Sequence, residues 1–401
     1  MSDKKILIIS TYPIANPRDG GQKRVNAIVK EYKKAFKQVK FMAVFKGRYP
    51  SYDKDDIYVP TDGSYPAHLI PFIGDVIAGS AIFSDSRIKN KMVKILRQYQ
   101  PDIIQIEQTF PYIGLKLLLE ELNMNPKLVL SSHNVEYRMK QEILDGLGVP
   151  AADSKPIIKK IREAEEELSK RATLVIAVSK DDIREHKKMG AKRLVLAPNG
   201  IERVAPSQEA VEYWRNYFKD KAIKYTASFI GSAHPPNWEG FKKMVGDRMG
   251  FVPPDTRMVL AGSIADYFQD NFKDMNLGHM TFWQRVIPVG RLDENKLAGL
   301  IAATDVILLP ITEGGGSNLK TAEAILSGRK IVATSYAFRS FEKYRDLPNI
   351  FIADDPDRFR QNILKAISSP LTERTKPQIE LAEKVQWHYS LKGAVKEVSE
   401  L

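Results

Sequence analysis

The chain has 401 residues and a formal net charge of +12, with 43% hydrophobic and 27% charged residues. This length exceeds what one hydrophobic core usually supports, so two domains are expected. The sequence contains no cysteine, which excludes disulfides, zinc–thiolate and iron–sulfur sites, and a cysteine nucleophile.

The N-terminal sequence MSDKKILIIS lacks the long apolar run and small-residue cleavage site of a secretory signal. No stretch approaches the roughly 18 uninterrupted apolar residues of a membrane span. The segment Ala67–Phe83 comes nearest, and His68, Pro71 and Asp75 interrupt it. We therefore expect a cytoplasmic protein.

Positive charge is concentrated in the first half of the chain. Residues 1–200 hold 34 Lys+Arg and 24 Asp+Glu, so they carry 34 − 24 = +10 of the net charge. Such an excess favours an acidic partner, for example the anionic inner face of a membrane or an acidic glycan, but a solubilising surface explains it equally well. Nucleic acid is the weakest of these partners, because neither a recognition-helix motif nor an aromatic RNA-binding signature is present.

Apolar runs alternate with amphipathic segments over the first 200 residues. The runs are continuous rather than alternating, which is typical of parallel strands covered on both faces. Helical spacing marks Gln22–Ala35 and Ser154–Arg171, and Ser179 followed by Asp182 resembles a capping box. The predicted strands are Lys5–Ser10, Val39–Val44, Asp102–Glu107, Lys127–His133, Thr173–Ser179 and Arg193–Asn199.

A second series of the same kind follows a segment rich in turn formers, Asn199–Gln208. The sequence therefore predicts an α/β protein with two doubly wound, Rossmann-like domains, over residues 1–203 and 204–385. The predicted strands of the second domain are Tyr225–Gly231, Arg257–Gly262, Val286–Gly290, Asp305–Pro310, Lys330–Ser335 and Ile350–Ala353.

Ligands of such sheets bind beyond the carboxyl ends of the strands, so the loops there are the candidate sites. Gly20 and Gly21 precede a helix whose free N–H groups can bind an anion, although a plain turn between strand and helix has the same sequence. His133 ends a strand and is suited to hydrogen bonding or proton transfer, unless local backbone groups satisfy it. Gly231 and Ser232 offer donors to a diphosphate, and Asn237 is a helix cap or a further donor.

The most specific segment is Pro310–Ile325, in which three glycines lead from a strand into a helix. Lys320 and Glu323 lie three residues apart and project from nearly the same helix face. A cation for phosphate oxygens beside a carboxylate for ribose hydroxyls suits a nucleoside diphosphate, whereas the simpler interpretation is a surface ion pair. The other candidate residues of this segment are Glu313, Gly314, Gly315, Gly316, Ser317, Asn318 and Leu319.

In this order, these elements resemble the retaining GT-B glycosyltransferases of family 4 over nearly the whole chain. The resemblance rests on Gly20–Gly21, on His133–Asn134 and on the Gly-rich segment with Lys320 and Glu323. It also rests on the sequences FIGS, which begins at Phe229, and PPN, which begins at Pro235. It implies two Rossmann-like domains facing across a cleft, and a C-terminal helix within 386–401 that crosses back to the N-terminal domain.

The resemblance also implies a reaction in which a sugar moves from a UDP-, GDP- or dTDP-sugar to a hydroxyl of a glycan, a lipid-linked or another acceptor. Glu323 would bind the ribose, Lys320 the diphosphate and His133 the transferred sugar. Val289, Gly290 and Arg291 would lie near the base. No metal or other cofactor would be required, and the role would be in polysaccharide or glycolipid synthesis.

The sequence departs from the family pattern at two places. The usual motif has two glutamates separated by seven residues, but nine separate Glu313 from Glu323, and Gly315 stands where the first glutamate is expected. Many members also carry Arg and Lys in the region of Ser232 and Asn237. The charge for the diphosphate must then come from Lys320 first, with Arg291, Lys242 and Lys243 as further candidates.

Two other functions are compatible with this architecture. A sugar-nucleotide epimerase has the same two-domain plan, but the six histidines here are scattered. A non-catalytic protein that binds sugar nucleotides or polyanions is the second alternative. An NAD enzyme is disfavoured because no G-x-G-x-x-G follows the first strand. Asp354–Asp355 is predicted to be a loop and helix cap rather than a metal site.

Overall fold

The computed structural model describes residues 1–60, 70–273, 277–314 and 317–401. These residues form two compact units. Unit 1 comprises Met1–Asn199, Ser317 and Trp387–Leu401, and unit 2 comprises Gly200–Gly314 and Asn318–Gln386. The division at Asn199 lies close to the domain boundary expected at residue 203.

Unit 1 is built on a seven-stranded parallel sheet in the order β3-β2-β1-β4-β5-β6-β7. Its strands are β1 (Ser2–Ser10), β2 (Phe36–Phe45), β3 (Ile57–Tyr58), β4 (Ile103–Glu107), β5 (Lys127–Ser131), β6 (Leu174–Ala177) and β7 (Leu194–Leu196). The edge strand β3 was not predicted, because two residues are too few to show a pattern. The other six were predicted, with ends displaced by up to three residues.

The helices of unit 1 cover this sheet and bury a core of aliphatic side chains. They are α1 (Gly20–Ala35), α2 (Gly74–Ser84), α3 (Ser86–Tyr99), α4 (Tyr112–Glu121), α5 (Glu136–Gly146), α6 (Ala151–Arg171), α7 (Lys180–Lys188), α16 (Trp387–Ser390) and α17 (Lys392–Ser399). The predicted helix start at Ser179 is confirmed, since Ser179 is the N-cap residue of α7 and its Oγ accepts from the Asp182 N–H at 3.0 Å.

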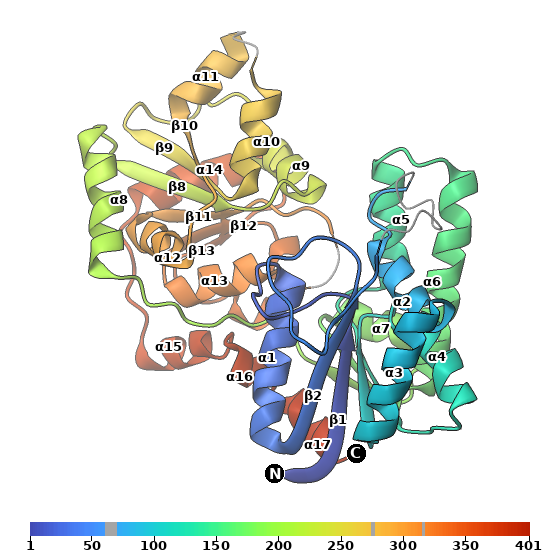
Figure 1. Ribbon diagram of the computed structural model, residues 1–401. Coiled ribbons are helices and arrows are strands. Elements are labelled where there is room, and N and C mark those ends of the chain that lie inside the picture. The colour runs from blue at the N-terminus through green and yellow to red at the C-terminus, as the bar shows by residue number, and fades with distance from the viewer. Residues whose placement is uncertain (61–69, 274–276, 315–316) are drawn as a thin grey trace. The chain divides into compact units, whose positions relative to one another are not determined.

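The C-terminal segment returns to unit 1, as the resemblance implied. Helix α17 packs against α1 and β7, and α16 packs against α1 (Figure 1). The expected single helix over 386–401 is wrong in detail, because it is divided at Leu391 into α16 and α17. Leu391 is buried and fixes this division against the unit.

Unit 2 is built on a six-stranded parallel sheet in the order β10-β9-β8-β11-β12-β13. Its strands are β8 (Tyr225–Ile230), β9 (Thr256–Ala261), β10 (Val286–Gly290), β11 (Val306–Leu309), β12 (Lys330–Ala333) and β13 (Ile350–Ile352). Its helices are α8 (Gln208–Asp220), α9 (Pro235–Met244), α10 (Ser263–Asn271), α11 (Leu277–Arg285), α12 (Glu294–Ala303), α13 (Leu319–Ser327), α14 (Pro356–Ser368) and α15 (Lys376–Glu383).

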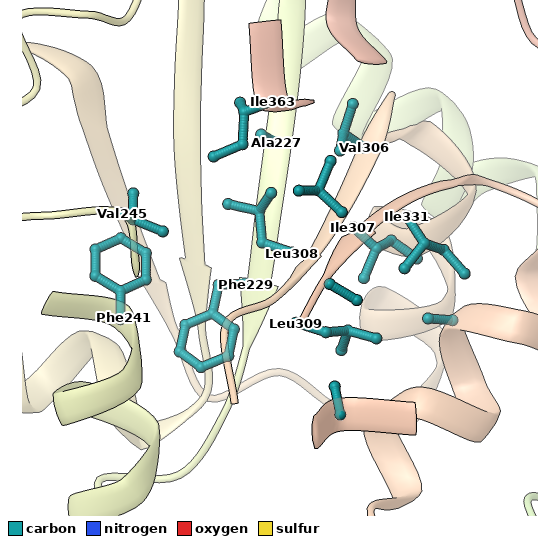
Figure 2. Packing of buried hydrophobic residues seen from close by; sticks show 14 of the residues in the cluster. Ala227, Phe229, Phe241, Val245, Val306, Ile307, Leu308, Leu309, Ile331 and Ile363 are labelled. Atoms are coloured by element: carbon teal, nitrogen blue, oxygen red, sulfur yellow. The ribbon is translucent and has the colours of Figure 1, made fainter. Parts of the chain in front are cut away.

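The core of unit 2 gathers around the central strands. Figure 2 shows Phe229 of β8 and Phe241 of α9 on one side of Leu308, and Ile331 of β12 on the other. The Phe229 and Phe241 rings are stacked, with centroids 5.6 Å apart. Strands buried on both faces explain why the sequence shows continuous apolar runs.

Two segments that connect the units pair with each other inside unit 2. Ile201 and Gln386 form a parallel β-bridge, and the Ile201 N–H donates to the Val385 carbonyl at 3.1 Å. Arg203 and Glu383 form an ion pair. Among the described residues, no helix is both long and apolar enough to cross a membrane.

The contact between α2 and α4 requires glycine. A Cβ on Gly79 would lie 1.9 Å from the Phe110 carbonyl oxygen, and one on Gly114 would lie 2.5 Å from the Gly79 oxygen. We expect Gly79→Ala to destabilise the protein by about 3 kcal/mol, because backbone atoms must move to admit the methyl group. Chemical denaturation measures this change.

Gly146→Ala is the matched control. Gly146 ends α5, and a Cβ added there would meet nothing within 4 Å, so this substitution should be neutral or slightly stabilising. Equal free energies of unfolding for the two variants would show that the α2–α4 contact does not need a glycine.

Candidate functional site

The carboxyl end of the unit 1 sheet carries a buried polar chain of side chains. His133, two residues beyond β5, contacts Tyr12 Oη through Nδ1 at 3.1 Å and Glu107 Oε2 through Nε2 at 2.8 Å. Gln105 Nε2 donates to Glu107 Oε1 at 2.6 Å, and Tyr32 Oη donates to Gln105 Oε1 at 2.5 Å. The predicted site residue His133 is therefore held from both sides.

Burial lowers the pKa of His133, and the charge of Arg24 lowers it further, while Glu107 acts in the opposite direction. Since the pKa falls below its ordinary value near 6.5, His133 is neutral at physiological pH. A neutral imidazole has one N–H and one acceptor nitrogen. It can hydrogen-bond a sugar hydroxyl, but it carries no charge for a phosphate.

The Gly20–Gly21 turn forms the first residues of α1, as expected for a helix N-terminus. Asp19 and Gln22 form a reciprocal capping box there. A Cβ on Gly21 would lie 2.8 Å from Tyr12 Oη, so the absence of a side chain at Gly21 leaves room for that hydroxyl beside His133. The structure thus brings Gly21 and His133 together.

Two functional candidates of unit 1 were missed by the sequence reasoning. Glu107 lies within a predicted strand, and its register beside Ser131 places it next to the end of β5. The sequence feature that pointed to Glu107 was the presence of polar side chains, Gln105 and Glu107, in a strand predicted to be buried on both faces. Arg24 is 1% exposed, and its NH1 donates to Ala197 O at 2.9 Å and to Asn199 Oδ1 at 3.1 Å.

Three glycines pack at the carboxyl end of the unit 2 sheet. Gly262 has a φ of +90°, and its Cβ would lie 2.2 Å from the Gly231 oxygen, so only glycine fits. Its N–H donates to Gly290 O at 2.6 Å, and the Gly231 N–H donates to Ala261 O at 2.9 Å. Gly231 was predicted to offer its N–H to a diphosphate, but that group is already used, and Gly231 instead packs closely against Gly262.

Lys320 and Asn237 meet beside this layer of glycines. Lys320 Nζ donates to Asn237 Oδ1 at 2.5 Å, and Asn237 Nδ2 donates to Ser232 O at 2.9 Å and to Ser232 Oγ at 3.1 Å. The prediction that Asn237 caps a helix is wrong. Helix α9 begins at Pro235 with His234 as its N-cap residue, so Asn237 lies inside the first turn and links Ser232 to Lys320.

Lys320 is a half-buried cation. Burial lowers its pKa to about 8, with Glu323 acting in the opposite direction. Lys320 and Glu323 line one small cavity of about 10 Å³, so they do share a helix face. The ammonium also lies 5.5 Å from the centre of the Phe229 ring. A dehydrated lysine of this kind gains from contact with an anion.

The remaining residues of the Gly-rich segment have varied surroundings. Asn318 is the N-cap residue of α13, and its Oδ1 accepts from the Lys320 N–H at 3.2 Å. Gly314 has a φ of +102°, and Tyr336 donates to its carbonyl. Ser317 Oγ accepts from the Asn199 N–H at 3.1 Å, and Leu319 begins α13. Gly315 and Gly316 lie outside the described residues.

Glu313 is exposed, and its side chain is hydrogen-bonded to that of Glu239 on α9, which raises the pKa of Glu239. Burial and then the charge of Lys320 lower the pKa of His234, and the charge of Glu313 acts to raise it. Glu313 therefore lies at the same edge as Lys320, although its spacing departs from the family motif.

The residues expected near the base lie at the end of β10. Val289 and Gly290 are half-buried, and Arg291 is exposed, with its Nε 3.9 Å from Asp266 Oδ2. Lys242, an alternative cation for the diphosphate, instead lies over the rings of Trp238, Tyr267 and Phe272 at 5.1, 5.6 and 5.5 Å. Lys243 is exposed on α9.

The described residues contain no group of three or more His, Cys, Asp or Glu side chains that could hold a metal ion. The Asp354–Asp355 prediction is confirmed at Asp355. Its carboxylate accepts from the Arg358 N–H at 2.9 Å and caps α14.

Comparisons with known proteins agree with this architecture. Residues 20–205 match the family model described as Glycosyltransferase Family 4. No curated protein matches the sequence.

Solved structures with the same fold cover almost the whole chain. HepE from Anabaena, in complex with UDP, is 14% identical with a TM-score of 0.69, and 99% of this chain and 100% of that chain are covered. Sucrose-phosphate synthase from Thermosynechococcus elongatus is 15% identical with a TM-score of 0.71, and 99% of each chain is covered. WaaG, a glycosyltransferase involved in lipopolysaccharide biosynthesis, is 13% identical with a TM-score of 0.61, and 98% of each chain is covered.

The lowered pKa of Lys320 makes the stability depend on pH. Between about pH 8 and 10.5 the unfolded chain keeps the Lys320 proton while the native protein has lost it, so stability rises with pH in this window. Relative to Lys320→Met, the wild type should gain at most about 1.4 kcal/mol per pH unit there. Urea denaturation at several pH values measures the difference.

Lys243→Met, at an exposed lysine of α9, is the control for a general effect of removing one positive charge. Wild-type and Lys320→Met stabilities that run parallel between pH 8 and 10 would contradict a buried ammonium at position 320.

Proposed function

From the family 4 resemblance, which the match over residues 20–205 supports, and the GT-B fold, we propose that this protein is a retaining glycosyltransferase. It transfers a sugar from a UDP-sugar to an acceptor hydroxyl. The observation that carries the proposal is the half-buried Lys320 at the first turn of α13, beside Glu323 and Gly231.

The donor site lies in unit 2. A diphosphate has two groups of negatively charged oxygens, and Lys320 is a half-buried cation that an anion would stabilise. The first turn of α13 adds the positive end of the helix dipole. Gly262 packs against Gly231, whereas a Cβ on Gly290 would meet nothing within 4 Å, so the open space at the strand ends lies beside Gly290.

UDP is the nucleotide for which the support is strongest. HepE, which shares the fold, has been solved with UDP and with UDP-glucose. A trehalose-6-phosphate enzyme from E. coli that shares it has been solved with UDP-2-fluoro glucose. GDP and dTDP remain alternatives, because the residues at the end of β10 contain no base-specific pattern.

During transfer, negative charge develops on the leaving diphosphate. Lys320 and the N-terminus of α13 stabilise that charge, an effect that removes several kcal/mol from a barrier. The acceptor hydroxyl attacks the anomeric carbon on the face that the leaving group vacates, which retains the configuration. Lys320 supplies the positive charge, so we propose that no metal ion takes part.

The acceptor binds to unit 1, where the basic excess of residues 1–200 suits an acidic glycan or a lipid-linked acceptor at an anionic membrane surface. A role in polysaccharide or glycolipid synthesis fits such an acceptor. The neutral His133 is suited to a hydroxyl rather than to a charged group.

Calorimetry with UDP, GDP, dTDP and their glucose conjugates, in the presence of EDTA, tests the donor site. We expect one UDP-sugar to bind, and Lys320→Ala to weaken the binding ten- to a hundredfold, because about 1.5–3 kcal/mol is lost with a charge-assisted hydrogen bond. Lys219→Ala, at an exposed lysine of α8, is the control and should bind normally.

Failure of the folded wild type to bind any of these nucleotides would refute a sugar-nucleotide site. Binding without transfer to any acceptor would favour the non-catalytic alternative, and conversion of the bound sugar to its epimer would favour the epimerase. A product with inverted anomeric configuration, read by NMR, would refute retention.

Glu323 and Lys320 are expected to bind different parts of the nucleotide. Glu323 is proposed to accept hydrogen bonds from the ribose hydroxyls, so Glu323→Gln should weaken UDP binding about tenfold and leave pyrophosphate binding unchanged. Lys320→Ala should weaken both. Calorimetric titrations with the two ligands measure the pattern, and an equal loss for UDP and pyrophosphate in Glu323→Gln would argue against a ribose contact.

A further inference from the structure

The hydrogen bonds around His133 have a defined direction. The chain Tyr32–Gln105–Glu107–His133–Tyr12 runs through unit 1 from α1 to the residues beyond β1, and each bond is between 2.5 and 3.1 Å long. Each group in such a chain fixes the donor or acceptor role of the next one.

Both oxygens of Glu107 are acceptors in this chain. Gln105 Nε2 donates to Oε1, and the second oxygen, Oε2, lies 2.8 Å from His133 Nε2. Glu107 and Gln105 are each 0% exposed, so water does not replace these partners. A carboxylate needs a donor, and therefore the His133 nitrogen that faces it must carry the proton.

The second ring nitrogen then has no proton. His133 Nδ1 lies 3.1 Å from Tyr12 Oη, and a neutral imidazole with Nε2–H offers a lone pair at Nδ1. The Tyr12 hydroxyl is the donor in this bond. Of the two groups that hold His133, Tyr12 is the half-buried one, and its hydroxyl lies against Gly21. Tyr12 is therefore the partner that a ligand can replace.

We propose that Glu107 is a positioning residue that holds His133 as the tautomer protonated at Nε2, so that Nδ1 accepts a hydrogen bond from a hydroxyl group. In the ligand-free protein that hydroxyl belongs to Tyr12. In the transfer reaction it belongs to the sugar, and this second half of the inference rests on the proposed function. His133 then selects a sugar with a free hydroxyl at that position, because an ether or deoxy position has no proton to donate.

The charged and titratable groups near His133 support the neutral ring. Glu107 on β4 favours the charged imidazolium, but burial and the charge of Arg24 on α1 oppose it. Tyr12 stays protonated, since burial and then the charges of Glu107 and Glu136 raise its pKa well above its usual value. The Tyr12 hydroxyl thus remains a donor at physiological pH.

Two-bond ¹H–¹⁵N correlation spectra of the full-length, ¹⁵N-histidine-labelled protein read the tautomer directly. His133→Gln identifies the His133 signals. In the wild type we expect a protonated Nε2 and an unprotonated Nδ1. His186 is an internal reference in the same spectra, because its ring nitrogens face the hydroxyls of Ser169 and Ser132 and not a carboxylate.

Glu107→Gln should reverse the tautomer. Gln105 still presents an N–H to residue 107, so the new carboxamide turns its oxygen toward Gln105 and its NH₂ toward His133 Nε2, which must then accept. The matched variant Tyr12→Phe removes only a hydroxyl and should leave Nε2 protonated. The His186 signals should not change in either variant.

A wild-type His133 protonated at Nδ1 would overturn the inference, as would an unchanged tautomer in Glu107→Gln or a reversed one in Tyr12→Phe. If Glu107→Gln does not fold, the wild-type and Tyr12→Phe spectra still decide it.

Steady-state kinetics test the proposed contact between His133 and a hydroxyl of the sugar. Glu107→Gln should lower kcat about tenfold, as expected for one lost hydrogen bond, and leave UDP affinity unchanged. An unchanged kcat would refute the substrate contact. A folded wild type that transfers no sugar would refute the proposed function and the substrate contact together, while the spectra would still establish the role of Glu107.

Discussion

The parallel pairing of both sheets is the constraint on which the rest of the structure depends. Because every strand in a sheet runs the same way, all carboxyl ends lie along one edge, and the loops that follow them gather there. In unit 1 this edge carries Glu107 and His133, and in unit 2 it carries the glycines at 231, 262 and 290. Parallel strands also need helical connections, which cover both faces and make the strands apolar.

The two edges differ in the chemistry they offer. The unit 1 edge holds a neutral histidine inside a chain of hydrogen bonds, with a buried arginine nearby. The unit 2 edge holds a lysine whose burial lowers its pKa to about 8, beside close-packed backbone. A neutral hydrogen-bonding ring suits sugar hydroxyls, and a cation suits phosphates. This division agrees with a protein that handles a charged nucleotide and an uncharged sugar.

Asn237 shows how a departure from a family pattern can be accommodated. Many members carry Arg and Lys in this region, whereas here Asn237 orients Lys320 from inside the first turn of α9 and is itself held by Ser232. The positive charge comes from the helix of the Gly-rich segment. In the proposed donor site, a single cation held by an amide would take the place of a pair of cations, so binding would depend on the protonation of Lys320.

The sequence by itself determined the elements and their order. Continuous apolar runs predicted twelve of the strands, and glycines after strands located both edges, because these features depend on local conformation and burial. The roles of particular atoms depended on tertiary contacts. Only the structure showed that Gly231 has already used its N–H, that Asn237 is not a cap, and that Glu107 faces His133. Glu107 and His133 lie 26 residues apart in the chain, and Asn237 and Lys320 lie 83 residues apart. Strand register decides which distant residues meet, and a single sequence does not encode it locally.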